Sequence, residues 1–390
     1  MNAMRVAVLH TFYRYPGGED RVVHDEIALL RQHGVAVRLL KWDNRALEAW
    51  PLHHRAARLL WNPVAYRRAV AWLQSWRPHV VHVHNTFPAA SLAVWHAVRR
   101  LGLPLVVTVH NYRWLCPNGL LFRQGRPCRA CVGRRVAWPA VVHGCWRGRA
   151  ASAGVALMLA WHRRRETWSL PQRYIAPSHF VRRVFQQAGW HTHHWVVKPH
   201  FAPRPLRPRT DPTARQYALF VGRLSPEKGL RWLVHLWQEA KLRIPLVVVG
   251  DGPDAPWVAQ VAQRQPWLRW AGQQSPAQVS AWMAKAAFLV APSQAYETFG
   301  RVVVEGFAHG LPVLVSQHGA LAELVTPERT GWVLPLGEPD AWAQAIVTAW
   351  EKRTTWLPDM GRSAQKIYEQ HYSPEVNLRQ LLRIYHEAQE

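Results

Sequence analysis

Two glutamates eight positions apart, Glu297 and Glu305, are placed to bind a polar ligand. Glu297 ends the loop after an apolar run (residues 287–293), and Glu305 falls inside the helix expected next. A helix N-terminus carries free N–H groups and a partial positive charge, so phosphate binds there. The spacing predicts a nucleotide-sugar site, with sugar hydroxyls at Glu297 and ribose hydroxyls at Glu305. The alternative is a pair of solvated helix residues, because short motifs recur by chance.

A second candidate lies upstream, where a β-rich run ends at Gly222. Ser225-Pro226 is typical of a helix N-cap followed by proline at the first helical position. Arg223 and Lys228 flank that turn, and two cations beside a helix N-terminus would hold a diphosphate and neutralise a leaving group. The alternative is two surface cations on a strand–helix loop.

These segments resemble the signature of glycosyltransferase family 4: Gly222-Arg-Leu-Ser-Pro-Glu-Lys-Gly229, and Glu297 separated by seven residues from Glu305. Further similarity covers almost the whole chain, at residues 17–19, 106–110, 246–252 and 310–314. The resemblance implies a retaining enzyme of the two-domain GT-B fold, which takes a sugar from a nucleotide-diphosphate sugar of the UDP or GDP type. It also implies no catalytic metal, and the chain has no Asp-x-Asp triplet.

The resemblance assigns further residues to the site. Gly17 and Gly18 follow the first expected strand, where glycine permits positive φ and close approach to a ligand. In the family this loop faces the donor phosphates and the acceptor; the alternative is an ordinary turn. His110 ends an expected strand (105–110), and the family often has a His there that contacts the donor sugar. The alternative is a structural histidine, as also for His82 and His84.

No nucleophile elbow is visible, which fits the front-face displacement usually proposed for retaining GT-B enzymes. In that scheme the leaving phosphate helps to accept the acceptor's proton, and Arg223 and Lys228 stabilise its developing charge. N–H groups of Phe299 and Gly300 would add to this effect at the helix start.

The four cysteines, Cys116, Cys128, Cys131 and Cys145, all lie in one insert. Clustered cysteines in a cytosolic chain favour metal over disulfides, so we expect a structural zinc site with four thiolates. Redox disulfides and four unlinked thiols are the alternatives.

The chain carries 49 Lys+Arg against 24 Asp+Glu, a formal net charge of +25. Such a field attracts nucleic acid or an acidic membrane leaflet. The longest apolar segment, residues 150–161, is too short to span a bilayer and forms either a core helix or a helix lying on a membrane. No secretory signal is visible. We expect a cytoplasmic protein, peripheral on the inner face of an anionic membrane.

Apolar runs alternate with amphipathic stretches in both halves, which predicts an α/β fold of two Rossmann-like, doubly wound domains with the site in the cleft between them. The acceptor-side domain spans 1–200 with the Cys-rich insert at about 113–148, and the donor-binding domain spans 217–368. The resemblance implies that a final helix (369–390) packs back on the first domain. Residues 199–212 are proline-rich and predict a stiff linker. Expected strands lie at 6–10, 35–40, 80–84, 105–110, 174–176, 195–198, 218–221, 246–249, 268–270, 288–291, 313–315 and 331–334.

The predicted function is transfer of a hexose-type sugar, with retention, to a lipid-linked or polysaccharide acceptor in cell-envelope or exopolysaccharide synthesis. One alternative is a non-transferring relative, a sugar-nucleotide epimerase or a phosphorylase. The other is a basic nucleic-acid-binding protein, which the charge and 23 tryptophans suggest. No nucleic-acid recognition motif accompanies the charge, so we expect no nucleic-acid partner.

Overall fold

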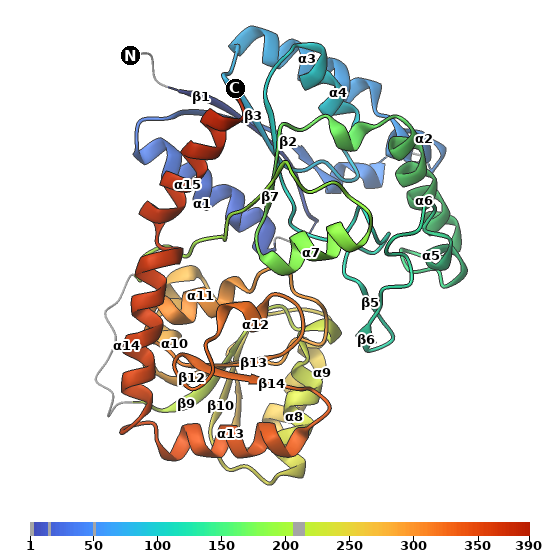
Figure 1. Cartoon of the computed structure of the whole chain (residues 1–390). Coiled ribbons are helices and arrows are strands. Elements are labelled where there is room, and N and C mark those ends of the chain that lie inside the picture. Colours follow the sequence, from blue (N-terminus) through green and yellow to red (C-terminus); the bar gives the residue numbers. More distant parts are fainter. Residues whose placement is uncertain (1–3, 15–16, 50–51, 206–214) are drawn as a thin grey trace. The chain divides into compact units, whose positions relative to one another are not determined.

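The computed structural model describes residues 4–14, 17–49, 52–205 and 215–390 (Figure 1). The chain divides into two compact units. The first comprises Met1–Leu121, Arg129–Pro199 and Asn377–Glu390, and the second comprises Phe122–Cys128 and His200–Val376. The expected linker at 199–212 lies outside the described residues from position 206 onward.

The first unit is built on a six-stranded parallel sheet with the order β2-β1-β3-β4-β7-β8. Its central strands are almost wholly buried, as expected for a parallel sheet covered on both faces, and they are apolar except for polar residues toward their carboxyl ends, such as His82 and His84 of β3. The strands are β1 Arg5–Phe12, β2 Ala36–Asp43, β3 Val80–Asn85, β4 Leu105–Thr108, β7 Arg173–Ala176 and β8 Trp195–Val197. The helices are α1 Gly18–Gln32, α2 Leu52–Leu60, α3 Pro63–Trp76, α4 Ala93–Arg100, α5 Trp138–Val142, α6 Arg149–Arg164 and α7 His179–Gln187, with short turns η1 Asn44–Ala49 and η2 Thr167–Ser169.

The second unit repeats the design with a parallel sheet ordered β11-β10-β9-β12-β13-β14. Its strands are β9 Tyr217–Val221, β10 Leu246–Val249, β11 Leu268–Trp270, β12 Ala286–Ala291, β13 Val313–Ser316 and β14 Gly331–Leu334. Its helices are η4 Pro226–Lys228, α8 Leu230–Glu239, α9 Ala255–Arg264, α10 Pro276–Lys285, α11 Arg301–Ala308, α12 Leu321–Leu324, α13 Pro339–Glu351, α14 Leu357–Ile367 and the π-turn η5 Tyr368–Tyr372.

The core of the second unit shows why both faces of its sheet are covered. Along β9, Ala218 and Phe220 belong to one buried cluster, whereas Tyr217 and Leu219 belong to another. Successive strand residues point to opposite faces, so each strand contributes to two cores. Each strand expected from the sequence is present, with ends that shift by a few residues.

Two further elements complete the described chain. The hairpin strands β5 (Phe122–Arg123) and β6 (Arg126–Pro127) pair with each other in the antiparallel sense. The last helix, α15 (Pro374–Glu387), belongs to the first unit from Asn377 onward, and Tyr385 on it hydrogen-bonds His82 of β3 at 2.8 Å. Among the described residues, no helix is both long and apolar enough to cross a membrane.

Candidate functional site

In the second unit, the turn after β9 packs on the loop after β12. The amide of Gln294 donates to the carbonyl of Glu227 at 2.8 Å. Gly229 adopts a φ of 75°, and a Cβ there would lie 2.1 Å from the carbonyl oxygen of Pro292. Only glycine permits this approach. The contact brings the signature turn and the loop that carries Glu297 together.

Lys228 and Glu297 meet at this junction. Lys228 Nζ donates to Glu297 Oε1 at 2.6 Å, and the Ser293 hydroxyl donates to the same oxygen. Burial raises the pKa of Glu297, but the Lys228 ammonium and the Ser293 hydroxyl lower it by more, so the pKa lies below its usual range. The pair keeps access to water, with side-chain exposures of 33% for Lys228 and 18% for Glu297. An ionised acceptor therefore lies beside an accessible cation.

The helix α11 starts at Arg301, four residues beyond Glu297. Gly300 precedes the helix with a φ of 116°, and a Cβ there would lie 2.4 Å from Cδ2 of Leu321. Phe299 is buried and packs edge-on against His200. Glu305 is the fifth residue of α11 and accepts a hydrogen bond from Arg301 Nε at 2.9 Å. Both predicted glutamates are thus held by a cation in the same unit.

One prediction for this unit is wrong. Ser225-Pro226 does not open the helix: Pro226–Lys228 form a single 3₁₀ turn, and α8 starts at Leu230. The Ser225 hydroxyl donates to Glu227 Oε1 at 2.6 Å and makes no cap, and the left-handed Gly229 interrupts the helical path. The two predicted cations therefore flank a turn and not a helix N-terminus.

Two glycines that sequence analysis did not assign to the site fix the backbone around Gly222 and Arg223. A Cβ on Gly250 would lie 1.9 Å from the carbonyl oxygen of Gly222, and one on Gly252 would lie 2.5 Å from that of Leu224. Both have positive φ, so glycine is required for conformation and for space. The segment 246–252 contained this signal, because two glycines directly follow an apolar strand. Arg223 itself is exposed.

A pocket of about 520 Å³, counting open solvent at its mouth, lies in the first unit near the carboxyl ends of β3 and β4. Polar side chains that line it include His84, Asn85, His110, Asn111 and Arg113. The strand β4 ends at Thr108, so His110 lies two residues beyond it and not within it as expected. Parallel sheets of this kind bind ligands beyond the carboxyl ends of their strands.

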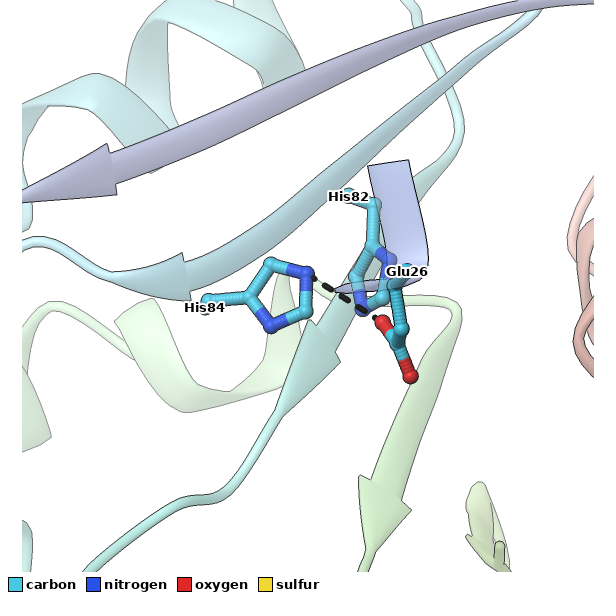
Figure 2. A group of neighbouring side chains, drawn as sticks. All are labelled: Glu26, His82 and His84. Atoms are coloured by element: carbon cyan, nitrogen blue, oxygen red, sulfur yellow. Dashed lines mark ion pairs between the residues drawn. The ribbon is translucent and has the colours of Figure 1, made fainter. Parts of the chain in front are cut away.

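His110 belongs to a buried network of polar side chains. His110 Nε2 and His84 Nδ1 are 2.9 Å apart, and their rings stack. Figure 2 shows Glu26, on α1, beside His82 and His84; its Oε2 lies 3.6 Å from His84 Nε2. Among the described residues, these three form the one group of His, Cys, Asp or Glu side chains close enough to share a metal ion.

The contacts of this group favour a structural role over a metal site. The ammonium of Lys198 donates to Glu26 Oε1 at 2.8 Å, and both side chains are almost wholly buried. Both nitrogens of His82 already have partners, the hydroxyls of Tyr385 and Thr108, each at 2.8 Å. Burial lowers the pKa of His82 to about 4, so the ring stays neutral. A buried carboxylate paired with an ammonium needs no second cation.

The loop that contains Gly17 and Gly18 differs from the expectation. Gly17 is extended (φ −132°) and Gly18 is the first residue of α1, so neither uses the positive φ that we expected. Asp20 fixes the loop, because its carboxylate accepts from the Gly17 amide at 3.0 Å and pairs with His10 at 2.8 Å. Nothing lies within 4 Å of a Cβ built on Gly18, which leaves that side of the loop open.

Glu19 is the acidic group of this loop closest to the pocket residues. It accepts hydrogen bonds from the hydroxyl of Tyr13 at 2.9 Å and from Asn111 Nδ2 at 3.3 Å. Burial raises the pKa of Glu19 to about 8, although both hydrogen bonds oppose the shift. The carboxyl group therefore holds a proton near neutral pH, and it lies next to Asn111, a residue that lines the pocket.

The four cysteines do not form a metal-binding group in this structure. Cys131 and Cys145 share a small apolar cluster with alanines of α5 and α6. The Cys116 thiol donates to Asn118 Oδ1, and burial raises its pKa. All four thiols are free of disulfides. The zinc site stays a prediction that this arrangement does not support.

Comparisons with known proteins identify the family of this chain. The family model described as Glycosyltransferase Family 4 matches residues 16–202, and the model described as Glycosyl transferases group 1 matches residues 215–352. A GDP-mannose-dependent alpha-mannosyltransferase of Mycobacterium tuberculosis is 32% identical over 347 residues, which cover 85% of this chain and 77% of that protein. A phosphatidyl-myo-inositol mannosyltransferase of Mycobacterium leprae is 25% identical over 98% of this chain and 96% of its own.

The solved structures show the same fold. The crystal structure of Anabaena HepE in complex with UDP and glucose matches 97% of this chain and 98% of its own, with a TM-score of 0.68 and 20% identity. Two parallel-sheet units with this likeness define the GT-B architecture. Because a relative is this similar over most of both chains, and because both units match family models, the chain belongs to glycosyltransferase family 4.

Proposed function

We propose that the enzyme is a retaining hexosyltransferase that uses a UDP or GDP sugar and a lipid-linked or polysaccharide acceptor in cell-envelope or exopolysaccharide synthesis. The observation that carries the proposal is the Lys228–Glu297 pair, an ionised carboxylate and an accessible ammonium 2.6 Å apart just before α11. GDP-mannose is the first donor to test, since it appears in the name of the Mycobacterium tuberculosis relative. The name of the Mycobacterium leprae relative favours an inositol-lipid acceptor.

In this proposal the donor's diphosphate lies against the turn at 222–229 and the amides of Phe299 and Gly300. Lys228 exchanges Glu297 for the diphosphate, whose charge grows as the glycosidic bond breaks. Glu297 is then free to accept hydrogen bonds from the sugar, and Glu305 accepts from the ribose. Arg223 is exposed and adds a second cation to the leaving group.

The proposed sugar transfer needs no nucleophile from the protein. The bond from the anomeric carbon to the diphosphate oxygen breaks, and the acceptor oxygen bonds to the same face of that carbon. The acceptor's proton passes to the leaving phosphate. His110 contacts the sugar, and Gly17 and Gly18 face the ligand. Both roles come from the family; the pocket beside His110 supports the first, and the open space around Gly18 supports the second.

The test uses purified enzyme with GDP-mannose, GDP-glucose, UDP-glucose and UDP-galactose. We expect one donor to raise the melting temperature, because a ligand that binds only the folded state stabilises it. That donor should be consumed only when an acceptor, such as an extracted phosphatidylinositol fraction, is added. NMR of the product should show the donor's anomeric configuration. Donor turnover without acceptor would instead identify an epimerase or, with phosphate present, a phosphorylase.

Two further parts of the proposal have separate tests. The enzyme works without a catalytic metal, so a chelator should leave the rate unchanged. The spacing of cysteines 116, 128, 131 and 145 predicts about one structural zinc ion per chain, although the four thiols do not gather around one point in this structure. Elemental analysis of purified protein measures this, and metal-free protein with four titratable thiols would exclude the zinc site.

A further inference from the structure

The helices α5 and α6 pack against each other (Figure 1), and several large apolar side chains on and beside them are exposed. Six large apolar side chains are exposed among the described residues, and four of them belong to this pair or to the segment just before it. They are Val136 at 46%, Trp138 at 52%, Val142 at 51% and Leu157 at 62%. Such a concentration marks an interaction site, whereas single exposed apolar residues are ordinary.

The helix α6 is apolar on its exposed face as well as on its buried face. Ser152, Val155, Leu159 and His162 are buried, which defines the face that packs on the unit. After the exposed Arg149 at its start, the exposed positions of α6 are Ala150, Ala153 and Leu157, and the next exposed residue is Arg164 at its end. No charged residue occurs between Arg149 and Arg163. A surface helix normally carries charged residues on its outer face. One apolar face of α6 packs on the core, and the second is available to contact another apolar partner.

The two helices form one packed piece. The buried residues Ala137, Ala140 and Ala156 pack together with Cys131, and small side chains permit this close approach. The guanidinium of Arg163 donates to the carbonyl of Arg134 at 2.8 Å, which ties the end of α6 to the segment before α5. The exposed apolar side chains therefore move as one surface.

Arginines surround this surface, and acids are absent from it. The chain has no Asp, Glu or Lys anywhere between Glu48 and Glu166, so every side chain there with a permanent charge is Arg. Arg134, Arg135, Arg147, Arg149 and Arg164 are exposed around the helix pair. Arg134 also lies over the ring of Trp138, 5.1 Å from its centroid. Arginine binds phosphate oxygens in a bidentate manner.

We propose that α5, α6 and their arginines form the surface by which the enzyme docks on an anionic lipid bilayer. Trp138, Val142 and Leu157 enter the boundary between headgroups and acyl chains, where tryptophan is favoured, and the arginines bind lipid phosphates. The inference rests on the proposed function in one respect: a lipid-linked acceptor requires the enzyme to work at a membrane.

Charge argues against a second copy of this chain as the occupant. Two copies that joined through this surface would bring two arginine-rich, acid-free rims together, and like charges at an interface are repulsive. An anionic bilayer supplies both the apolar layer and the compensating phosphates.

The test measures co-sedimentation with vesicles of phosphatidylcholine alone and of phosphatidylcholine with 30% phosphatidylglycerol. Wild-type enzyme should bind the anionic vesicles and lose binding as salt rises. The double variant Trp138→Ser/Leu157→Asn should bind about tenfold more weakly at equal salt, because the inserted side chains are lost. Arg135→Gln/Arg149→Gln should also weaken binding by roughly tenfold and should flatten the salt dependence.

Matched controls separate this surface from general charge and exposure. Val64→Asn removes an apolar side chain of similar exposure (48%) on α3, and Arg243→Gln/Arg264→Gln removes two exposed arginines of the second unit. Both controls should bind as wild type does. All variants should keep the donor-induced rise in melting temperature, which reports the proposed function independently of the membrane.

Three outcomes would overturn the inference: equal binding to neutral and anionic vesicles, wild-type binding by both double variants, or no binding at all. A dimer in light scattering that the Trp138→Ser/Leu157→Asn variant abolishes would assign the surface to a second copy. If no nucleotide sugar shifts the melting temperature while vesicle binding follows the expected pattern, the proposed donor fails and the docking surface stands.

Discussion

Replacement of Lys228 by Met should change the pH at which the enzyme loses activity in acid. In the wild type, the Lys228 ammonium lies 2.6 Å from Glu297 Oε1 and helps to keep the pKa of Glu297 below its usual value. Burial acts in the opposite direction and is left less opposed in the variant. The pKa of Glu297 should therefore rise.

A hydrogen bond to a charged group contributes about 1.5–3 kcal/mol, and the variant loses this stabilisation of the ionised Glu297 carboxylate. The acid limb of kcat/KM for the donor should therefore move to higher pH, since in the proposed mechanism the ionised carboxylate accepts hydrogen bonds from sugar hydroxyls. Turnover at neutral pH should also fall more than donor affinity, because leaving-group charge grows in the transition state.

The assay is the pH profile of kcat/KM between pH 4 and 9 for wild type, Lys228→Met and Lys366→Met. Lys366 is exposed on α14 of the same unit and serves as the matched control for loss of one positive charge. An acid limb at the same pH in all three enzymes would refute the reasoning, because it would show that Lys228 does not affect the pKa of Glu297. A variant that raises KM alone, with turnover intact, would make Lys228 a binding residue only.

Three other predictions follow from single contacts. Glu305→Gln should weaken donor binding by roughly 1.5–3 kcal/mol in calorimetry, because the ribose loses a charged partner; unchanged affinity would remove Glu305 from the site. Gly300→Ala should destabilise the fold by roughly 1–3 kcal/mol in urea unfolding, because of its positive φ and the close Leu321 side chain, whereas Gly337→Ala, with open space around its Cβ, should be nearly neutral. His82 has a pKa of about 4 in the folded state against 6.5 when exposed, so the unfolded state takes up its proton first as pH falls. The free energy of unfolding should therefore be unaffected by His82 above pH 6.5 and should drop by on the order of 3 kcal/mol between pH 6.5 and 4. His82→Gln should reduce this loss of stability in acid.

The sequence predicted the fold because its signals are local. The apolar strand β10 directly precedes Gly250 and Gly252, and the run that forms β12 directly precedes the loop to Glu297. Strands of a parallel sheet that is buried on both faces are apolar throughout, so their positions can be identified without knowledge of their partners. The helix start at Ser225-Pro226 was predicted wrongly because the left-handed Gly229 depends on its contact with Pro292, and the sequence does not reveal that contact.

The support of the first-unit pocket could not be predicted for a related reason. His84 and His110 were candidates from their strand ends, but Glu26 comes from α1, Lys198 from the residue after β8, and Tyr385 from α15. Tyr385 is 303 positions from its partner His82. No spacing rule joins residues so distant along the chain. Tertiary packing alone brings them together, and a single sequence contains no signal for the pairing.

Two lysine–glutamate pairs among the described residues differ in burial, which separates a structural contact from the one that we propose takes part in catalysis. The Lys198 and Glu26 side chains are 1% and 2% exposed, so removal of either partner would leave an uncompensated charge and neither can leave its partner for a ligand. Lys228 and Glu297 are 33% and 18% exposed at nearly the same distance. A diphosphate can therefore replace Glu297 beside Lys228, and water or a hydroxyl can replace Lys228 beside Glu297, at little cost in solvation. In the proposed mechanism the accessible pair exchanges partners, whereas the buried pair joins α1 to the residue after β8 and Glu26 also contacts His84, the partner of His110.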